Sequence, residues 1–133
     1  MENRITLLLV DDEASVRRGL RMRLELEPDV EVIGEAADGA NAVRLAESLV
    51  PTVVVMDVEM PVLNGIDATS EIAMRSPGVA VVVLSMHDDA ATLRRAHDAG
   101  ASAFVAKHRM DDGLIAAIRG AAREKRGARN ESE

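Results

Sequence analysis

Five polar residues of types that could together transfer a phosphoryl group each follow an apolar run. They are three carboxylates, a hydroxyl and an ammonium: Asp11, Asp12, Asp57, Ser85 and Lys107. Crowded carboxylates repel one another and therefore require a cation, and hard oxygen ligands with room for water suit Mg²⁺ better than a transition metal. Once a metal neutralises such a cluster, one carboxylate can attack phosphorus, and Asp57 is the best placed to do so.

Phosphoryl transfer requires mainly positioning and neutralisation of the phosphoryl oxygens. The metal would bind one oxygen, the Lys107 ammonium a second, and the Ser85 hydroxyl with backbone amides of its loop a third. Taken singly, the residues have ordinary explanations: Asp11 and Asp12 could cap a helix, and Ser85 and Lys107 could be solvated surface groups. The chemical interpretation therefore depends on elements that bring all five together.

The elements follow from short apolar runs that alternate with longer amphipathic segments. The runs predict five strands, at residues 5–10, 30–36, 52–56, 79–84 and 102–106. Several are rich in valine and almost continuously apolar, as expected for strands covered on both faces. Between them apolar residues recur at helical spacing, and Gly100 stands where a helix must end before the last strand.

This alternation predicts an α/β fold, a doubly wound parallel sheet between two layers of helices, because parallel strands need crossover connections. In such a sheet the functional site lies at the carboxyl ends of the strands, beside the point where the strand order reverses. All five polar residues stand at those ends. Their convergence is an inference from topology, since they are far apart in the sequence.

Composition excludes several other classes of protein. The chain has no cysteine, so disulfides, thiolate metal sites and cysteine nucleophiles are absent. A net charge of −7 disfavours direct binding of nucleic acid. No apolar run is long enough to cross a membrane and MENRIT at the start does not resemble a signal peptide, which makes a cytoplasmic protein the expectation.

Four motifs carry a family resemblance: LLVDDE, VVVMDVEMPVLNGI, VVVLSMHDD and GASAFVAKH. In their order and spacing, the chain resembles the receiver domain of two-component response regulators over residues 4–124. The resemblance implies the flavodoxin-like, CheY-like (βα)5 fold with strand order 2-1-3-4-5. It makes residues 1–124 the receiver domain and residues 125–133 a polar tail or the start of a linker.

The resemblance also assigns roles at the site. Asp57 would be the phosphoacceptor, phosphorylated by a sensor histidine kinase with Mg²⁺ as cofactor. Asp12 would bind Mg²⁺ directly, Asp11 through water, and Glu59 through its backbone carbonyl. The opening set of carboxylates would thus act as one metal and phosphoryl site.

Three further residues receive roles in switching. Lys107 would bind the phosphoryl group, Ser85 would be the switch hydroxyl, and Phe104, the sole aromatic residue, the switch aromatic. Phosphorylation would change the surface of the fourth helix, the fifth strand and the fifth helix and favour a homodimer through it. Many receivers place a cis proline after the lysine, where this chain has His108, so the loop there is expected to differ.

Two surface groups could modulate the switch. Glu59 and His87 stand two residues beyond Asp57 and Ser85, so we expect them to influence the lifetime of the phosphoryl group. Arg17, Arg18 and Arg21 would lie near the surface that meets the kinase, although a solvated helix face explains them as well.

The motif details are most similar to NarL/LuxR-type transcriptional regulators, whose DNA-binding output domain would lie beyond the present chain. The alternative is a complete single-domain receiver that acts through protein contacts. An enzyme of the Mg²⁺-dependent aspartyl-phosphate phosphatase type is a weaker alternative, because that class carries its nucleophile after the first strand. A P-loop nucleotide hydrolase is excluded by the absence of GxxxxGK[ST].

Overall fold

Strands and helices alternate along the described part of the chain. The computed structural model describes residues 4–60 and 63–132, and the side chains at 110–112 and 128–132 are not described. The strands are β1 Ile5–Val10, β2 Val30–Ala36, β3 Val53–Asp57, β4 Ala80–Ser85 and β5 Ala103–Ala106. The helices are α1 Ala14–Leu24, α2 Gly39–Leu49, α3 Gly65–Arg75, α4 Ala90–Asp98, the 3₁₀ turn η1 Lys107–Arg109 and α5 Met110–Ser132. The predicted strand bounds are therefore correct to within one residue.

The strands form one parallel sheet in the order β2-β1-β3-β4-β5, as predicted. The order reverses between β1 and β3, because the chain proceeds outward on one side of β1 and then returns to its other side. The carboxyl ends of β1 and β3 are thus neighbours, which places the loops that follow them at the expected crevice.

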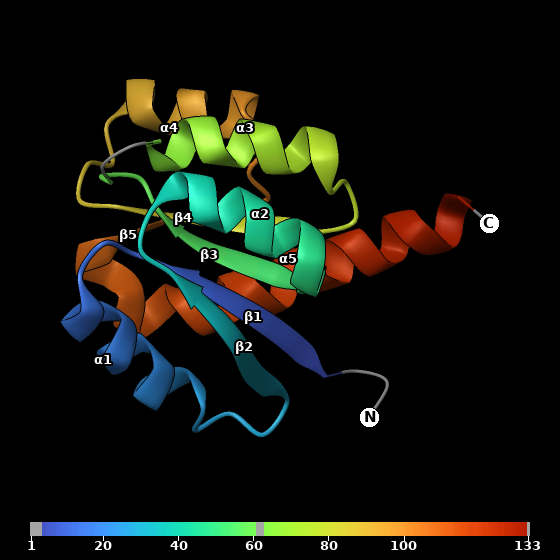
Figure 1. Ribbon diagram of the computed structural model, residues 1–133, viewed down its shortest axis with the longest axis horizontal. Coiled ribbons are helices and arrows are strands. Elements are labelled where there is room, and N and C mark those ends of the chain that lie inside the picture. Colours follow the sequence, from blue (N-terminus) through green and yellow to red (C-terminus); the bar gives the residue numbers. More distant parts are fainter. Residues whose placement is uncertain (1–3, 61–62, 133) are drawn as a thin grey trace.

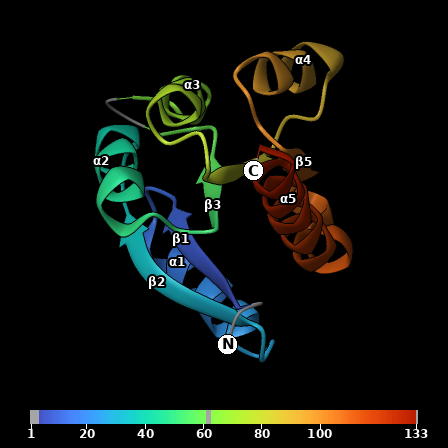
Figure 2. The same ribbon diagram turned by 90° about the vertical axis from the view of Figure 1, so that its right-hand side faces the viewer.

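Successive side chains of the central strands lie in two separate hydrophobic cores, because side chains alternate between the two faces of a strand. Leu7 and Leu9 of β1 lie in a core with residues of α1 and α5, whereas Leu8 and Val10 lie in a core with residues of α2, α3 and α4. Figures 1 and 2 show the two helix layers on opposite faces of the sheet. Burial on both faces explains the nearly continuous apolar runs of the strands.

Gly100 ends α4 as the sequence predicted. Its φ of +104° lies in the left-handed region, where a side chain is disfavoured, and its amide donates to the carbonyl of His97 at 3.0 Å. The chain can then enter β5 directly, which brings Lys107 to the site edge of the sheet.

Helix α5 continues to Ser132, so the expected change from domain to tail after residue 124 falls inside a helix, whose last turns extend past the sheet (Figure 1). Lys125 donates to the carbonyl of Pro77 at 3.1 Å and Arg126 to that of Arg4 at 3.0 Å. Among the described residues, none of the helices has the length and apolar character needed to cross a membrane.

Candidate phosphoryl and metal site

Three carboxylates meet where β1 and β3 end. Asp11 and Asp12 lie in the loop after β1, Asp57 is the last residue of β3, and one oxygen of each lies within 4.8 Å of the others. Asp11 and Asp57 are only 1% and 2% exposed, whereas Asp12 is exposed at the mouth of the crevice. The structure thus brings together the three acidic residues that the sequence predicted.

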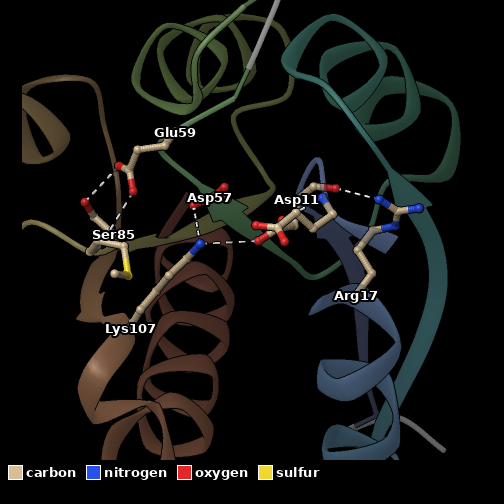
Figure 3. Close-up of polar contacts among 8 residues, drawn as sticks. Asp11, Arg17, Asp57, Glu59, Ser85 and Lys107 are labelled. Atoms are coloured by element: carbon tan, nitrogen blue, oxygen red, sulfur yellow. Dashed lines mark hydrogen bonds and ion pairs between the residues drawn. The ribbon is translucent and has the colours of Figure 1, made fainter. Parts of the chain in front are cut away.

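Lys107 reaches the same cluster from the end of β5. Its Nζ lies 2.8 Å from Asp57 Oδ1 and 3.4 Å from Asp11 Oδ2, so a single ammonium bridges two carboxylates (Figure 3). Lys107 is the first residue of η1, which immediately follows β5. Because η1 follows β5 directly, the backbone of Lys107 is fixed at the end of β5, and its long side chain reaches the acidic cluster from there.

Burial is the largest single influence on the pKa of each of the two central groups, but it prevails only in Asp57. Desolvation raises the pKa of Asp57 to about 6, opposed by the hydrogen bond from Lys107 and reinforced by the negative charge of Asp11. Desolvation lowers the pKa of Lys107, but its hydrogen bond and attraction to Asp57 outweigh that effect, and its pKa is raised overall. Lys107 is therefore a permanent cation, and Asp57 is a carboxylate with a proton affinity well above that of a free aspartate.

The donor set fits Mg²⁺. Asp11, Asp12 and Asp57 supply carboxylate oxygens alone, and Lys107 neutralises only part of their charge. Two of the three ligands are buried and the third is exposed, so a cation could keep several water molecules, as Mg²⁺ prefers. The assignment of the Glu59 backbone carbonyl as a further ligand stays a prediction.

Ser85, fully buried at the end of β4, is bonded on the side away from the acidic cluster. Its hydroxyl donates to Glu59 Oε2 at 3.0 Å, while the Met86 amide donates to Glu59 Oε1 at 3.3 Å. The His87 amide donates to Ser85 Oγ at 3.0 Å. Glu59 thus extends across from the β3–α3 loop and holds the end of β4 (Figure 3).

Phe104 is half-buried in β5 between two surface hollows. One hollow, towards α4, is lined by Leu93, Ala96 and His97 beside Phe104, and the other, towards α5, by Gly113 and Ala117 beside Phe104. Phe104 therefore contributes to the lining of both hollows, and it packs against the core on the α2, α3 and α4 face of the sheet.

The two histidines near the site are exposed and lie outside the acidic cluster. His87 contributes its backbone amide to Ser85, and His108 Nε2 lies 3.9 Å from Asp88 Oδ2. The loop after Lys107 forms the 3₁₀ turn η1, and no peptide bond of the described residues is cis.

Gly65 is a site residue that the chemistry-based interpretation missed. Its amide donates to the Val58 carbonyl at 3.0 Å, and a Cβ at this position would lie 2.0 Å from the backbone oxygen of Asp57. Only glycine allows α3 to begin so close to the end of β3. The Asn64–Gly65 pair was the available signal, because it combines an N-cap with a residue that lacks Cβ.

The three arginines of α1 differ in their surroundings. Arg17 and Arg21 both bind Glu35 of β2, each through Nε at 2.9 Å, whereas Arg18 is exposed. Arg17 also donates from Nη1 to the backbone carbonyl of Asp11 at 2.6 Å. Arg17 is thus the least exposed of the three, at 17%, whereas Arg18 is exposed and the Arg21 side chain is 38% exposed, so the kinase-docking role stays a prediction for Arg18 and Arg21.

Comparison with known proteins identifies the same family that the sequence motifs resemble. A family model described as "Response regulator receiver domain" matches residues 7–119. The transcriptional regulatory protein DegU of Brevibacillus brevis is 40% identical over 118 residues, which cover 89% of this chain and 50% of DegU. The nitrate/nitrite response regulator NarL of Escherichia coli is 32% identical over 117 residues, 88% of this chain and 54% of NarL.

The present chain therefore spans about half the length of these curated relatives. Among solved structures, the response regulator domain of Thermotoga maritima CheB superposes with a TM-score of 0.84 at 35% identity, covering 90% of this chain and 97% of that domain. The family match covers the site from its acidic loop to Lys107, and the shared fold covers 90% of this chain. The chain belongs to the receiver domain family of two-component response regulators.

Proposed function

We propose that Asp57 accepts a phosphoryl group from the phosphohistidine of a sensor kinase. The observation that carries this proposal is the buried Asp57 carboxylate, which is paired with Lys107 and clustered with Asp11 and Asp12. An Asp57 oxygen attacks phosphorus as the bond from phosphorus to the histidine nitrogen breaks. The products are an aspartyl phosphate and a free histidine on the kinase.

Bound Mg²⁺ would neutralise the carboxylates and the phosphoryl oxygens. Asp11 and Asp12 would hold the ion with Asp57. Lys107 Nζ, already 2.8 Å from Asp57, would follow the charge from the carboxylate to a phosphoryl oxygen. The chemistry of the chain is then self-phosphotransfer and autodephosphorylation, without turnover of a small-molecule substrate.

The decisive test is intact mass after incubation with acetyl phosphate, with and without Mg²⁺, for the wild type and Asp57→Asn. We expect a single phosphoryl adduct that requires both Asp57 and Mg²⁺. An adduct on Asp57→Asn, or one that forms equally well with EDTA, would contradict the proposal. Sustained hydrolysis of a phosphorylated small molecule other than the phosphodonor would instead favour the phosphatase alternative, because autodephosphorylation by itself releases phosphate from acetyl phosphate repeatedly.

The switch would be an exchange of partners by Ser85. Its hydroxyl now donates to Glu59, and the aspartyl phosphate would offer new acceptor oxygens on the other side. Phe104, with hollows on two flanks, can then repack and alter the α4–β5–α5 surface. Because DegU and NarL are named as regulators, we propose a DNA-binding output domain as the element controlled.

We further propose that Glu59 and His87 set the lifetime of the aspartyl phosphate. Both residues are exposed, and both contact Ser85. The Glu59 carboxylate accepts a hydrogen bond from the Ser85 hydroxyl, and the backbone amide of His87 donates one to that hydroxyl. The test is the rate of phosphate loss from Glu59→Ala and His87→Ala after removal of the phosphodonor. Rates equal to the wild type in both variants would refute the assignment.

A further inference from the structure

We propose that Arg17 is a positioning residue for the metal site, which it serves by fixing the main chain between the two acidic ligands Asp11 and Asp12. The inference rests on the proposed Mg²⁺-dependent function. It extends that function to a side chain that touches neither the metal position nor the phosphoryl position.

The hydrogen bonds of Arg17 form a relay, that is, a connection from Glu35 on the edge strand β2 to the backbone of Asp11 in the loop after β1. Arg17 Nη1 donates to the carbonyl oxygen of Asp11 at 2.6 Å (Figure 3). Arg17 Nε donates to Glu35 Oε1 at 2.9 Å. The Arg17 side chain is only 17% exposed. A planar guanidinium that is held at two points by a carboxylate and a carbonyl has little freedom to move.

Glu35 is placed to anchor this relay by the strand register. Glu35 pairs with Leu9 in the β1–β2 ladder. Since Leu9 precedes Asp11 by two residues, Glu35 lies beside the end of β1. Leu9 belongs to the core shared with α1, so Glu35 faces the same helix. The hydrogen bond from Arg17 is the main influence that lowers the pKa of Glu35, which is accordingly a firm anionic anchor.

The bonded carbonyl has a specific mechanical role. The carbonyl of Asp11 and the amide of Asp12 belong to one planar peptide unit, so a fixed carbonyl direction also fixes the plane from which the Asp12 side chain departs. The Asp11 side chain is held separately, by the Glu13 amide at 2.9 Å and by Lys107 at 3.4 Å. Arg17 is the only side chain that the described contacts show bonded to this carbonyl.

Helix capping does not replace this contact. Glu13 is the N-cap residue of α1 but makes no side-chain capping hydrogen bond. The exposed Asp12 carboxylate consequently depends on backbone geometry for its direction toward the metal. Groups of this outer kind typically change metal affinity by about 10–100-fold when they are removed.

Charge and positioning predict opposite results, which makes the inference testable. Arg17 is a cation near a cation site, so removal of its charge alone would strengthen Mg²⁺ binding. Loss of its hydrogen bond to the Asp11 carbonyl would weaken binding. Arg21 is the matched control, because it is an arginine of the same helix that also binds Glu35 and has no described bond to the acidic loop.

The experiment is a titration with MgCl₂ followed by the amide NMR shifts of Asp12 and Asp57, in the wild type, Arg17→Ala, Arg17→Lys and Arg21→Ala. Far-UV circular dichroism in urea verifies that each variant is folded under the titration conditions. We expect Arg17→Ala to bind Mg²⁺ about 10-fold more weakly or worse, and Arg21→Ala to bind as tightly as the wild type or more so. Arg17→Lys keeps the charge but lacks the planar guanidinium that donates to two acceptors at once. Its Mg²⁺ affinity should lie between those of the wild type and Arg17→Ala.

Two outcomes would overturn the inference, and they are distinguishable. Wild-type affinity in Arg17→Ala, or a gain as large as that of Arg21→Ala, would remove Arg17 from the site and leave the magnesium proposal intact. Absence of Mg²⁺-dependent shifts in the wild type would refute the magnesium site itself, and with it the role of Arg17.

Discussion

Asp57 combines two properties that oppose each other at the scale of a single residue. Its burial at the end of β3 shields the proposed nucleophile from water, yet the same burial raises the pKa of its carboxyl to about 6. The ion pair with Lys107 offsets only part of this effect. Without a metal, the ionised carboxylate is therefore a destabilising group in the folded protein, and a bound cation would relieve it.

Asp57→Asn should be more stable than the wild type without metal above pH 6. The folded-state pKa of about 6 exceeds the unfolded value of 3.8, so the folded wild type binds more protons between these values and loses stability as the pH rises through them. After a discount for solvent screening we expect a difference of about 1–2 kcal/mol at pH 8. Urea unfolding followed by circular dichroism is suitable, because the chain has no Trp or Tyr.

The comparison should be repeated at pH 4 and with Mg²⁺. The advantage of Asp57→Asn should shrink at pH 4, where the wild-type Asp57 carboxyl is protonated, and should shrink or reverse when Mg²⁺ binds the wild type. Equal stability of the two proteins at every pH would show that burial does not perturb Asp57.

Gly65→Ala should damage both stability and phosphorylation. The added Cβ would meet the backbone oxygen of Asp57 at 2.0 Å, and neither backbone segment can move freely. Overpacking of this kind typically costs about 1–3 kcal/mol, and we expect slower adduct formation from acetyl phosphate even where the variant is fully folded.

Gly19→Ala is the matched control for Gly65→Ala. Gly19 lies inside α1, and a Cβ added there would meet no atom within 4 Å, so alanine should stabilise the helix by about 0.5–1 kcal/mol. Phosphorylation of Gly19→Ala should match the wild type. Similar behaviour of the two alanine variants would mean that the close approach at Gly65 is not required.

At the scale of elements, Glu59 links the β3–α3 loop to the end of β4. Its carboxylate accepts from the Ser85 hydroxyl and from the Met86 amide, so the two loops are held together in this state. The proposed aspartyl phosphate would have to compete with that charge-assisted contact to bind the Ser85 hydroxyl. In the proposed switch, the resting position of Ser85 is consequently set by Glu59, whose side chain lies outside the acidic cluster.

Glu59→Ala should therefore lower the concentration of beryllofluoride needed for half-saturation in Mg²⁺, measured by NMR. Loss of a hydrogen bond to a charged group corresponds to about 10-fold. Repulsion by the Glu59 charge would give the same sign, so the comparison is repeated in a Ser85→Ala background. If the effect persists in full there, the hydrogen bond to Ser85 is not its cause.

At the scale of the whole molecule, the proposed output surface is α4–β5–α5. Phe104 lies between hollows lined by residues of α4 and of α5, and Leu93 on α4 is 41% exposed. A change in Phe104 packing would alter both hollows together. This arrangement can couple one phosphoryl group to a broad surface.

Beryllofluoride with Mg²⁺ should shift the chain towards a homodimer, measured by size-exclusion chromatography with light scattering. Asp57→Asn should remain unchanged in the same buffer, and Leu93→Asp should bind beryllofluoride but fail to dimerise, because a charge would be placed in the contact. A dimer that forms equally in Asp57→Asn would separate oligomerisation from phosphorylation.

The sequence by itself determined the alternation of strands and helices, the parallel sheet and the acidic and basic residues of the site. Strand-length apolar runs reveal buried parallel strands directly, since both faces must be covered. Asp11, Asp57, Ser85 and Lys107 could be identified because each follows such a run, and topology then requires those ends to converge.

Only the tertiary structure decided which partners the polar side chains choose. Arg17 resembled Arg18 and Arg21 in sequence, yet it alone binds the Asp11 carbonyl, and Ser85 is bonded to Glu59, 26 residues away. Hydrogen bonds depend on directions and on differences of a few tenths of an ångström, which register and loop paths set. Apolar burial is non-directional, so its pattern can be predicted from spacing, whereas the contacts that tune the site cannot.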